Sequence, residues 1–214
     1  MKRVIDLIKS DYRRYYATGN GKTHPIAIIL LTQGLWASSV YRVAHAVRLV
    51  RDRSIFHRLA DVFLIFLQKW IEIITAIELP ADCDIGPGLY IGHFGPIIIN
   101  GRVKIGSYNN LSQGVTIGVV QRGSRQGVPV IGDRVYIGPN AIIIGGIEIG
   151  HDVAIGAGAV VTRSIPPLGV AAGNPAKILS REGSFEMVHY DGMDNDPARM
   201  QAMSLRVQIR DTPE

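Results

Sequence analysis

Residues 131–161 read IGDRVYIGPNAIIIGGIEIGHDVAIGAGAVV, and an aliphatic residue returns at every sixth position of this stretch. A period of six fits neither an α-helix, with 3.6 residues per turn, nor a long strand, with a period of two. It fits a solenoid with one short strand on each of three flat faces, so that three units close one triangular turn. The aliphatic residues that would point inward are Ile131, Ile137, Ile143, Ile149, Ile155 and Val161.

The same period extends towards the N-terminus. It is present at Ile85, Ile91 and Ile97, and it resumes two residues out of register from Ile105 onward, which predicts one irregular coil. Glycine directly follows many of the aliphatic residues, and we expect it at corners where the backbone needs a positive φ. An ordinary parallel sheet would need crossover connections of about a dozen residues, for which the repeat leaves no room. The sequence therefore predicts a mainly β chain built on a parallel β-helix.

The repeat also divides the chain. Residues 1–78 have helical spacing and form an expected N-terminal helical domain, with a long apolar helix at its end. Residues 79–179 form the expected β-helix domain, and the period lapses at 119–130, which predicts a loop that leaves the coil. Residues 180–214 are expected to be a polar tail with one short helix or partial disorder.

Composition narrows the function classes. The single cysteine, Cys83, excludes an intrachain disulfide and a thiolate metal cluster, so we expect a cytoplasmic protein. Asp6 and Asp11 interrupt the region where a secretory signal would be apolar. The histidines lack the close spacing of a zinc site, so no metal is expected.

A net charge of +5 is too modest to indicate nucleic acid. Basic residues between Arg42 and Arg58 fit a solvated helix face or a helix that lies on anionic lipid at the inner face of the membrane.

Residues from about Tyr41 to Leu179 resemble the serine acetyltransferase family of hexapeptide-repeat transferases, and most closely its relatives in polysaccharide assembly. The resemblance implies a left-handed β-helix and acetyl-CoA as the donor. It is carried by Tyr41-Arg42-Val43-Ala44-His45, Gly92-His93-Phe94-Gly95, Gln113-Gly114-Val115-Thr116-Ile117-Gly118 and Gly173-Asn174-Pro175-Ala176-Lys177.

The resemblance places the general base of the family at His93. An imidazole titrates near neutral pH, so it can remove the proton of an acceptor hydroxyl during attack on the thioester and return it to the leaving thiolate. The family has a carboxylate fifteen positions earlier that orients this base, and Glu78 stands there in place of the usual aspartate. A helix-terminal glutamate without a catalytic role is the alternative for Glu78.

The resemblance also implies a cofactor site in the groove between adjacent coils. The residues that it places along the pantetheine arm and the nucleotide are Thr116, Gly118, Ala141, Ala159, Asn174, Pro175 and Lys177. Small residues at coil corners are also required by the fold itself, so both interpretations remain open for the small ones.

Two departures from the family concern the acceptor. Serine-specific members have an aspartate before the base and an Arg-His pair before the loop proline, whereas this chain has Gly92 and the pair Gly127 and Val128. We therefore expect the acceptor to be a sugar hydroxyl of a surface polysaccharide or its precursor, with Arg122 and Arg125 of the loop at the acceptor site. Serine O-acetyltransferase of cysteine biosynthesis is the nearest alternative. A non-catalytic oligomeric scaffold is the alternative from another class.

The resemblance further implies a homotrimer, because the family packs three coils side by side with each active site shared between neighbours. The apolar helices before Glu78 would then either pair two trimers or rest on a membrane.

Overall fold

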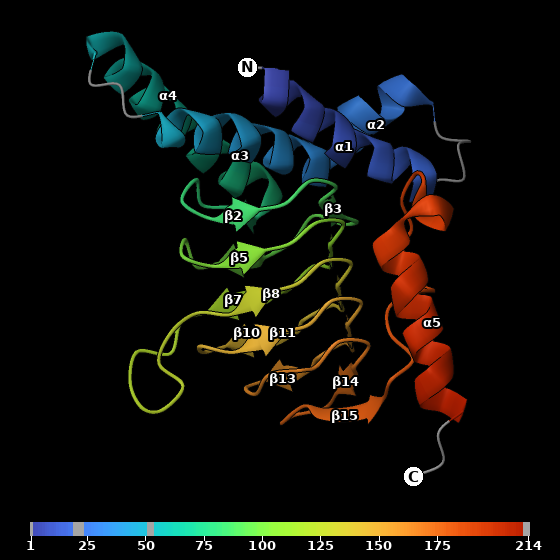
Figure 1. The fold of residues 1–214 in the computed structure, drawn as a ribbon. Helices are drawn as coiled ribbons and strands as arrows, with labels where there is room; N and C mark the ends of the chain where they lie inside the picture. The colour runs from blue at the N-terminus through green and yellow to red at the C-terminus, as the bar shows by residue number, and fades with distance from the viewer. Residues whose placement is uncertain (1, 19–23, 51–53, 212–214) are drawn as a thin grey trace.

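The computed structural model describes residues 2–18, 24–50 and 54–211. Figure 1 shows helices across one end of a stack of short strands and one further helix along its side. The helices are α1 (Lys2–Thr18), α2 (Pro25–Leu31), α3 (Gln33–Leu49), α4 (Ile55–Thr75) and α5 (Pro197–Asp211), with a short 3₁₀ helix η1 (Met193–Asn195). The strands are β1 (Ile77–Glu78), β2 (Asp84–Ile85), β3 (Tyr90–Ile91), β4 (Ile97–Ile99), β5 (Lys104–Ile105), β6 (Asn110–Leu111), β7 (Thr116–Gly118), β8 (Val130–Ile131), β9 (Tyr136–Ile137), β10 (Ile142–Ile144), β11 (Glu148–Ile149), β12 (Ala154–Ile155), β13 (Val160–Val161), β14 (Val170–Ala172) and β15 (Lys177–Ser180).

The strands form three sheets, one for each face of the coil. We name them sheet A (β1-β4-β7-β10-β13), sheet B (β2-β5-β8-β11) and sheet C (β3-β6-β9-β12-β14-β15). All pairings are parallel except that of β14 with β15. The aliphatic residues of the repeat pair coil by coil, as in Ile105 with Ile131 and Ile131 with Ile149, and they fill the core. The predicted left-handed parallel β-helix, with a helical region before it, is confirmed.

The shift of two residues in the repeat falls within β4. Ile97 and Ile99 both point into the core, while Ile98 between them is 51% exposed. Ile97 pairs back to Ile77 of β1, and Ile99 pairs onward to Ile117 of β7. Both registers therefore belong to one continuous core, because residues two apart in a strand point to the same face.

The glycines of the repeat serve a different purpose from the one expected. Positive φ occurs three residues after the inward aliphatic residue, as at Arg134 and Asp152. The glycine that directly follows the aliphatic residue is instead required by close stacking: a Cβ on Gly132 would lie 2.9 Å from the carbonyl carbon of Gly150, and one on Gly150 would lie 2.4 Å from the nitrogen of Pro167. The expectation of positive φ at these glycines was wrong, because adjacent coils approach too closely there for any side chain.

The helices close the first coil. Tyr41 of α3 donates its hydroxyl hydrogen to the carbonyl of Cys83 at 2.9 Å and accepts the N–H of Ile85 at 3.1 Å. Arg42 donates to the carbonyls of Ile85 and Gly86. These contacts satisfy main-chain groups of the first coil that would otherwise be an open strand edge. The motif at 41–45 is thus structural.

The C-terminal residues cover sheet C. Ser184 donates a hydrogen bond to the carbonyl of Arg134, Asn110 donates to the carbonyl of Met187 at 2.8 Å, and Tyr190 stacks on Tyr108 with 4.1 Å between ring centroids. Helix α5, with 15 residues, then runs along the coil in Figure 1. The described part of the expected tail is therefore ordered structure, and sheets A and B keep their outer faces uncovered by it.

Within the described residues no single helix is both long and apolar enough to span a membrane, although α2 and α3, bent by 77° at their junction, pass that test as a pair.

Candidate functional site

The candidate site extends over the outer face and both edges of sheet A. The residues that point outward from its five strands are Glu78, Ile98, Thr116, Ile142 and Val160, which stand in register from coil to coil. One edge consists of the corners that lead from sheet C into sheet A, and we name it the C–A edge. The loop at 119–130 leaves from the other edge, directly after β7.

His93 lies at the top of the C–A edge, between β3 and β4. Its side chain is exposed and has no hydrogen bond or ion pair with the described residues. The corner is held by Gly95, whose N–H donates to the carbonyl of Thr75 at 3.1 Å and whose φ is +134°. His93 is thus presented to the surface from a fixed backbone, where its imidazole can meet a substrate.

Glu78 is half-buried on the outer face of β1, directly beside Ile98 of β4. No hydrogen bond joins it to His93, and it has no ion-pair partner among the described residues. Both side chains belong to the first coils of the β-helix. The contact between Glu78 and His93 that the resemblance implies is not formed in the single chain. The role of Glu78 stays a prediction.

Gln113 is a candidate that the sequence reasoning did not single out. Ile91 pairs with Leu111, so Gln113 occupies in the second coil the position that His93 occupies in the first. Its Oε1 is buried without a hydrogen-bond partner in the described structure. A Cβ on Gly95 would lie 3.1 Å from the Cβ of Gln113, so Gln113 supports the corner of His93 from below. The sequence did contain a signal for Gln113, because the period of the repeat places it one coil after His93.

The cofactor residues expected along the coil fall into two groups. Thr116 and Gly118 are half-buried at the two ends of β7, so both remain accessible on sheet A. Ala141 and Ala159 stand along the C–A edge, but their side chains are fully buried in the core. Their N–H groups donate to Gly138 and Gly156, and their carbonyls accept from the strands beside them. A cofactor arm could therefore meet these alanines only through their main chain.

The residues expected at the nucleotide end lie at the bottom of the same edge. Asn174 and Pro175 are exposed in the turn between β14 and β15, and Lys177 is exposed at the start of β15. The Lys177 ammonium has no partner among the described residues and is free to meet a phosphate. The structure thus aligns His93, Ala141, Ala159, Asn174 and Pro175 along the C–A edge.

The loop lies at the opposite edge, where it projects from the coil in Figure 1. Val120 and Gly127 close it with a pair of main-chain hydrogen bonds of 2.9 and 3.0 Å. Arg122 and Arg125 help line a cavity of about 260 Å³ between the loop and the coil. Arg125 donates to the carbonyl of Thr162 at 2.8 Å, and Arg122 is exposed. In one chain these arginines and His93 are therefore on different edges of sheet A.

The structure shows the surroundings of the two positions at which the sequence departs from serine-specific members of the family, namely Gly92 and the pair Gly127 and Val128. A side chain at Gly92 would put its Cβ 3.3 Å from the ring of Tyr90, so an aspartate there would press on that ring. Gly127 is held by main-chain bonds to Val120, and Val128 packs against the core. Neither position before Pro129 offers a charged side chain that could hold a carboxylate.

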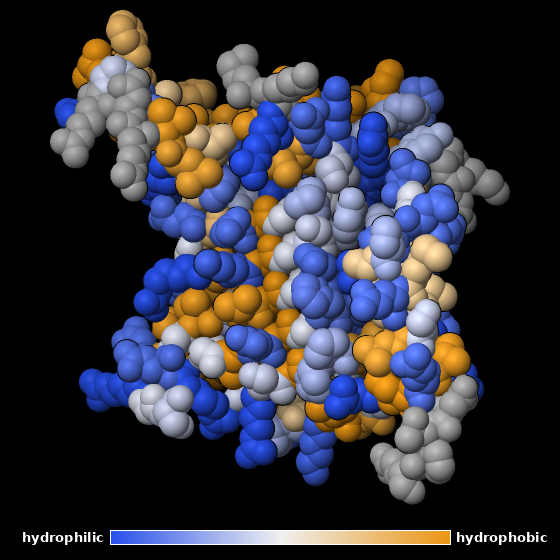
Figure 2. Space-filling view, in the orientation of Figure 1, coloured by the Kyte–Doolittle hydropathy of each residue, from blue (hydrophilic) through white to orange (hydrophobic). Residues whose placement is uncertain are grey.

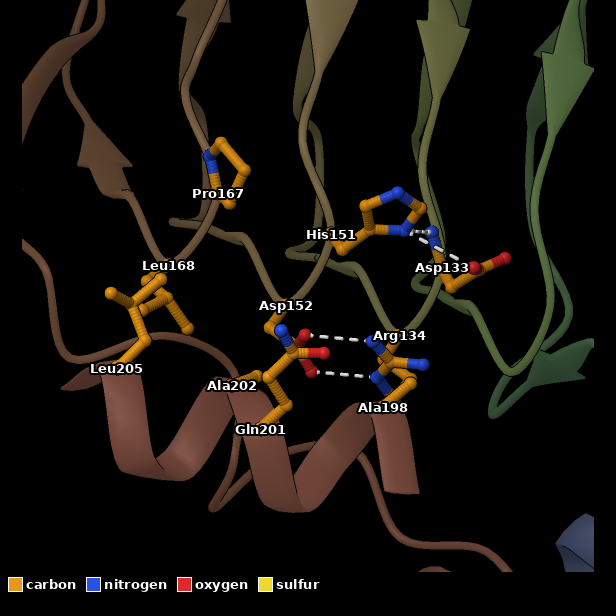
Figure 3. Close-up of a pocket in the computed structure, with 10 residues that line it drawn as sticks. All are labelled: Asp133, Arg134, His151, Asp152, Pro167, Leu168, Ala198, Gln201, Ala202 and Leu205. Atoms are coloured by element: carbon orange, nitrogen blue, oxygen red, sulfur yellow. Dashed lines mark hydrogen bonds and ion pairs between the residues drawn. The ribbon is translucent and has the colours of Figure 1, made fainter. Parts of the chain in front are cut away.

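A separate pocket of about 360 Å³ lies between the opposite corners of the coil and α5 (Figure 3). His151 Nδ1 lies 2.9 Å from the main-chain nitrogen of Asp133, whose N–H the neutral ring accepts, and 3.1 Å from Oδ2 of the same residue, with which the protonated ring forms an ion pair. Arg134 and Asp152 form a buried ion pair at 2.8 Å. The polar groups of this pocket are used for structure, and in the part of the chain that the structure describes no group of three His, Cys, Asp or Glu side chains could hold a metal ion.

Comparisons with known proteins agree with the fold. The family "Bacterial transferase hexapeptide (six repeats)" matches residues 129–163. Serine acetyltransferase of Helicobacter pylori strain 26695 is 34% identical over 155 residues, which are 72% of this chain and 86% of the relative. The structure of Neisseria gonorrhoeae serine acetyltransferase in complex with serine has 26% identity and a TM-score of 0.72 over 84% of this chain and 70% of that one. A serine acetyltransferase in complex with CoA has 26% identity and a TM-score of 0.70 over 82% of this chain and 69% of that one.

Proposed function

Because this chain belongs to the serine acetyltransferase family of hexapeptide-repeat transferases, we propose that it transfers the acetyl group of acetyl-CoA to the hydroxyl of L-serine. It is an O-acetyltransferase with acetyl-CoA as donor. The observation that carries the choice of serine is that a relative 34% identical over 86% of its own length is a serine acetyltransferase. It favours this acceptor over the sugar that the sequence led us to expect.

In the proposed reaction His93 removes the proton of the acceptor hydroxyl. The oxygen attacks the thioester carbonyl, the bond from carbon to sulfur breaks, and the imidazolium returns the proton to the thiolate of CoA. The exposed position of His93 on a corner fixed by Gly95 supports this role. Glu78 would stabilise the imidazolium once substrate has closed the site. The CoA arm would lie on sheet A from Thr116 towards Lys177, so that its phosphates approach the ammonium group.

We further propose a homotrimer, singly or as a pair of trimers. Sheet C is covered by the C-terminal residues of the same chain, whereas sheet A carries the exposed apolar side chains of Ile98 and Ile142. His93 and the loop occupy different edges of sheet A, so the loop of one copy can complete the site of the next. A sedimentation mass three or six times that of one chain is expected, and a stable active monomer would contradict it.

A sugar hydroxyl remains a second candidate, and one observation favours it. Gly92, Gly127 and Val128 offer no charged side chain to an amino acid, while Arg122 and Arg125 leave a cavity at the loop. A glycan with several hydroxyls and no ammonium group would not need the missing groups. An acceptor panel therefore has to contain both classes.

The deciding experiment measures CoA thiol release from acetyl-CoA with L-serine, with nucleotide sugars and with oligosaccharides. Wild type should respond to serine, and His93→Ala should lose about 100- to 10,000-fold in kcat/KM while its Tm stays unchanged. His189→Ala is the matched control. Activity with saccharides alone would overturn serine as the acceptor, and activity that survives His93→Ala would overturn the base.

The scaffold alternative is tested separately. Equilibrium dialysis with acetyl-CoA should show binding that falls when Lys177 is replaced by Ala. A chain that neither binds nor turns over acetyl-CoA would be a scaffold rather than an enzyme.

A further inference from the structure

Helix α4 has an apolar face that the fold does not use. Six large side chains recur along it at alternating intervals of three and four residues, which places them on one side of the helix. Each of them is between 59% and 80% exposed. We name this face the outer stripe of α4; it consists of Phe56, Leu59, Phe63, Phe66, Trp70 and Ile73.

The opposite side of α4 already supplies its packing. Leu64 and Thr75 are buried, Ile71 packs against the core, and Gln68 donates a hydrogen bond to the carbonyl of Leu79 at 3.0 Å. The outer stripe is therefore not needed to hold α4 on the protein. Figure 2 shows hydrophobic side chains gathered at the end of the molecule where Figure 1 places α4. Four aromatic rings in a stripe of six are typical of helices at the boundary between water and lipid.

The helical part of the chain is also where the positive charge lies. Residues 1–78 contain twelve Lys and Arg and six Asp and Glu, for a net charge of +6, whereas residues 79–214 contain eleven and twelve, for a net charge of −1. Arg58 and Lys69 are exposed on α4 itself, where Asp61 and Glu72 balance their charges and Glu72 pairs with Lys69. Arg51 and Arg53, from the basic stretch noted in the sequence, lie outside the described residues. The described part of this region, residues 2–18, 24–50 and 54–78, contains nine Lys and Arg and five Asp and Glu, for a net charge of +4, so the exposed apolar stripe and an excess of basic charge belong to the same end of the molecule.

We propose that the outer stripe of α4 binds the surface of an anionic membrane, with the helix lying in the plane of the interface. A helix of 21 residues is about 30 Å long, enough for the whole stripe to enter the boundary between headgroups and acyl chains. The basic groups of the helical region would meet lipid phosphates. This assignment goes beyond the proposed acetyl transfer and does not depend on the identity of the acceptor.

Charge decides between a membrane and a second copy of the chain as the occupant. Pairing two copies through the stripe would bring together two regions whose described residues each carry +4, and their repulsion opposes association. An anionic bilayer attracts the same charge. A short apolar helix, α2, exposes Ile26 and Leu30, and Figure 1 places it on the side of the helical layer opposite to α4.

The test is cosedimentation of the full chain with vesicles of phosphatidylcholine alone or with about 30% phosphatidylglycerol. The variant Phe63→Gln/Phe66→Gln removes two rings of the stripe without a change of charge. The matched control is Met203→Gln/Val207→Gln, which replaces two exposed apolar side chains of α5. Trp70 provides a fluorescence signal in addition to that of Trp36, and Trp70→Phe should abolish the blue shift that vesicles cause.

Binding is expected only with the anionic vesicles, with a blue shift of Trp70 emission and a loss at high salt. The stripe variant should bind at least about tenfold more weakly, and the α5 variant should bind as wild type does. Absence of binding to anionic vesicles would overturn the proposal. So would unchanged binding of the stripe variant, or a stripe variant whose only effect is a smaller mass in sedimentation equilibrium, which would make the stripe an interface between copies. Acetyl transfer in solution is measured in parallel and distinguishes failure of this proposal from failure of the proposed reaction.

Discussion

His93 and Gln113 occupy equivalent positions in successive coils, because each follows by two residues one member of the pair Ile91 and Leu111. The corner that carries the candidate base therefore lies, at Gly95, next to a side chain that is one coil away in space. Gly95 makes this contact possible, since any larger residue there would press on Gln113.

Replacement of Gly95 by Ala should damage activity more than stability. The φ of +134° disfavours any side chain, and the new Cβ would lie 3.1 Å from that of Gln113, so the corner that carries His93 must move. We expect a loss of at least about tenfold in kcat, with a destabilisation of about 1–2 kcal/mol. Steady-state kinetics and guanidinium unfolding measure the two effects.

The control for this variant is Gly192→Ala. Gly192 also has a positive φ, of 79°, but no atom lies within 4 Å of the position of its Cβ. It should show a similar loss of stability with unchanged kcat. Equal kinetics for both variants and wild type would contradict a role for this corner in catalysis.

Removal of one partner from the buried ion pair of Asp11 with Arg42 should strongly destabilise the helical region. Both side chains are buried, two hydrogen bonds of 3.0 Å join them, and Asp11 also accepts the N–H of Leu89 at 2.9 Å. Asp11→Ala leaves the guanidinium buried without its counter-charge, which should lower the free energy of unfolding by about 3–5 kcal/mol. Equilibrium unfolding in guanidinium chloride measures the change.

An exposed pair gives the comparison. Glu72→Ala removes the surface ion pair with Lys69 and should change stability by less than about 1 kcal/mol. If both alanine variants have the same effect, burial of the Asp11 pair is not what makes it important.

The thiol of Cys83 should react very slowly with thiol reagents in the folded protein. Burial, followed by the negative charges of Asp82 and Glu78, raises its pKa from 9.0 to about 12. At pH 8 the thiolate fraction, and with it the rate of reaction with a disulfide reagent, should be about 1,000-fold below that of an ordinary thiol. One thiol per chain should react after denaturation. Rapid labelling of native protein would show that the first coil opens readily.

Acid should weaken the C-terminal helix through Asp196. Burial raises the pKa of this carboxyl, but the hydrogen bond from Tyr190, the N–H groups of Ala198 and Arg199 and the charge of Arg134 outweigh it, so the pKa lies below 3.8. A lowered pKa in the folded state stabilises the protein above about pH 4, and this contribution is lost as the pH falls through the folded-state pKa.

The variant Asp196→Asn tests this dependence while keeping a helix-capping side chain. It should be less stable than wild type by about 1 kcal/mol at pH 6, and the difference should shrink towards pH 2. Thermal unfolding over this pH range provides the measurement. A constant difference at every pH would show that the carboxylate charge is not involved.

The period of six in residues 131–161 was sufficient to determine the β-helix, because each unit has to place one aliphatic side chain inward and no other regular structure repeats in this way. The lapse at 119–130 likewise determined the loop, and the four motifs at 41–45, 92–95, 113–118 and 173–177 together indicated the family. The reason for the glycines was not accessible, since it depends on how closely Gly132 approaches Gly150 in the next coil.

Tertiary structure alone decided the remaining relationships, because they join residues that only the winding of the coil brings together. It placed Gln113 beneath His93, buried Ala141 and Ala159 in the core, folded the C-terminal residues over sheet C and left the outer stripe of α4 uncovered. A local pattern specifies which face a side chain takes on its own strand or helix. What lies on the other side of that face depends on the register between coils and on the packing of helices, which the repeat itself does not encode.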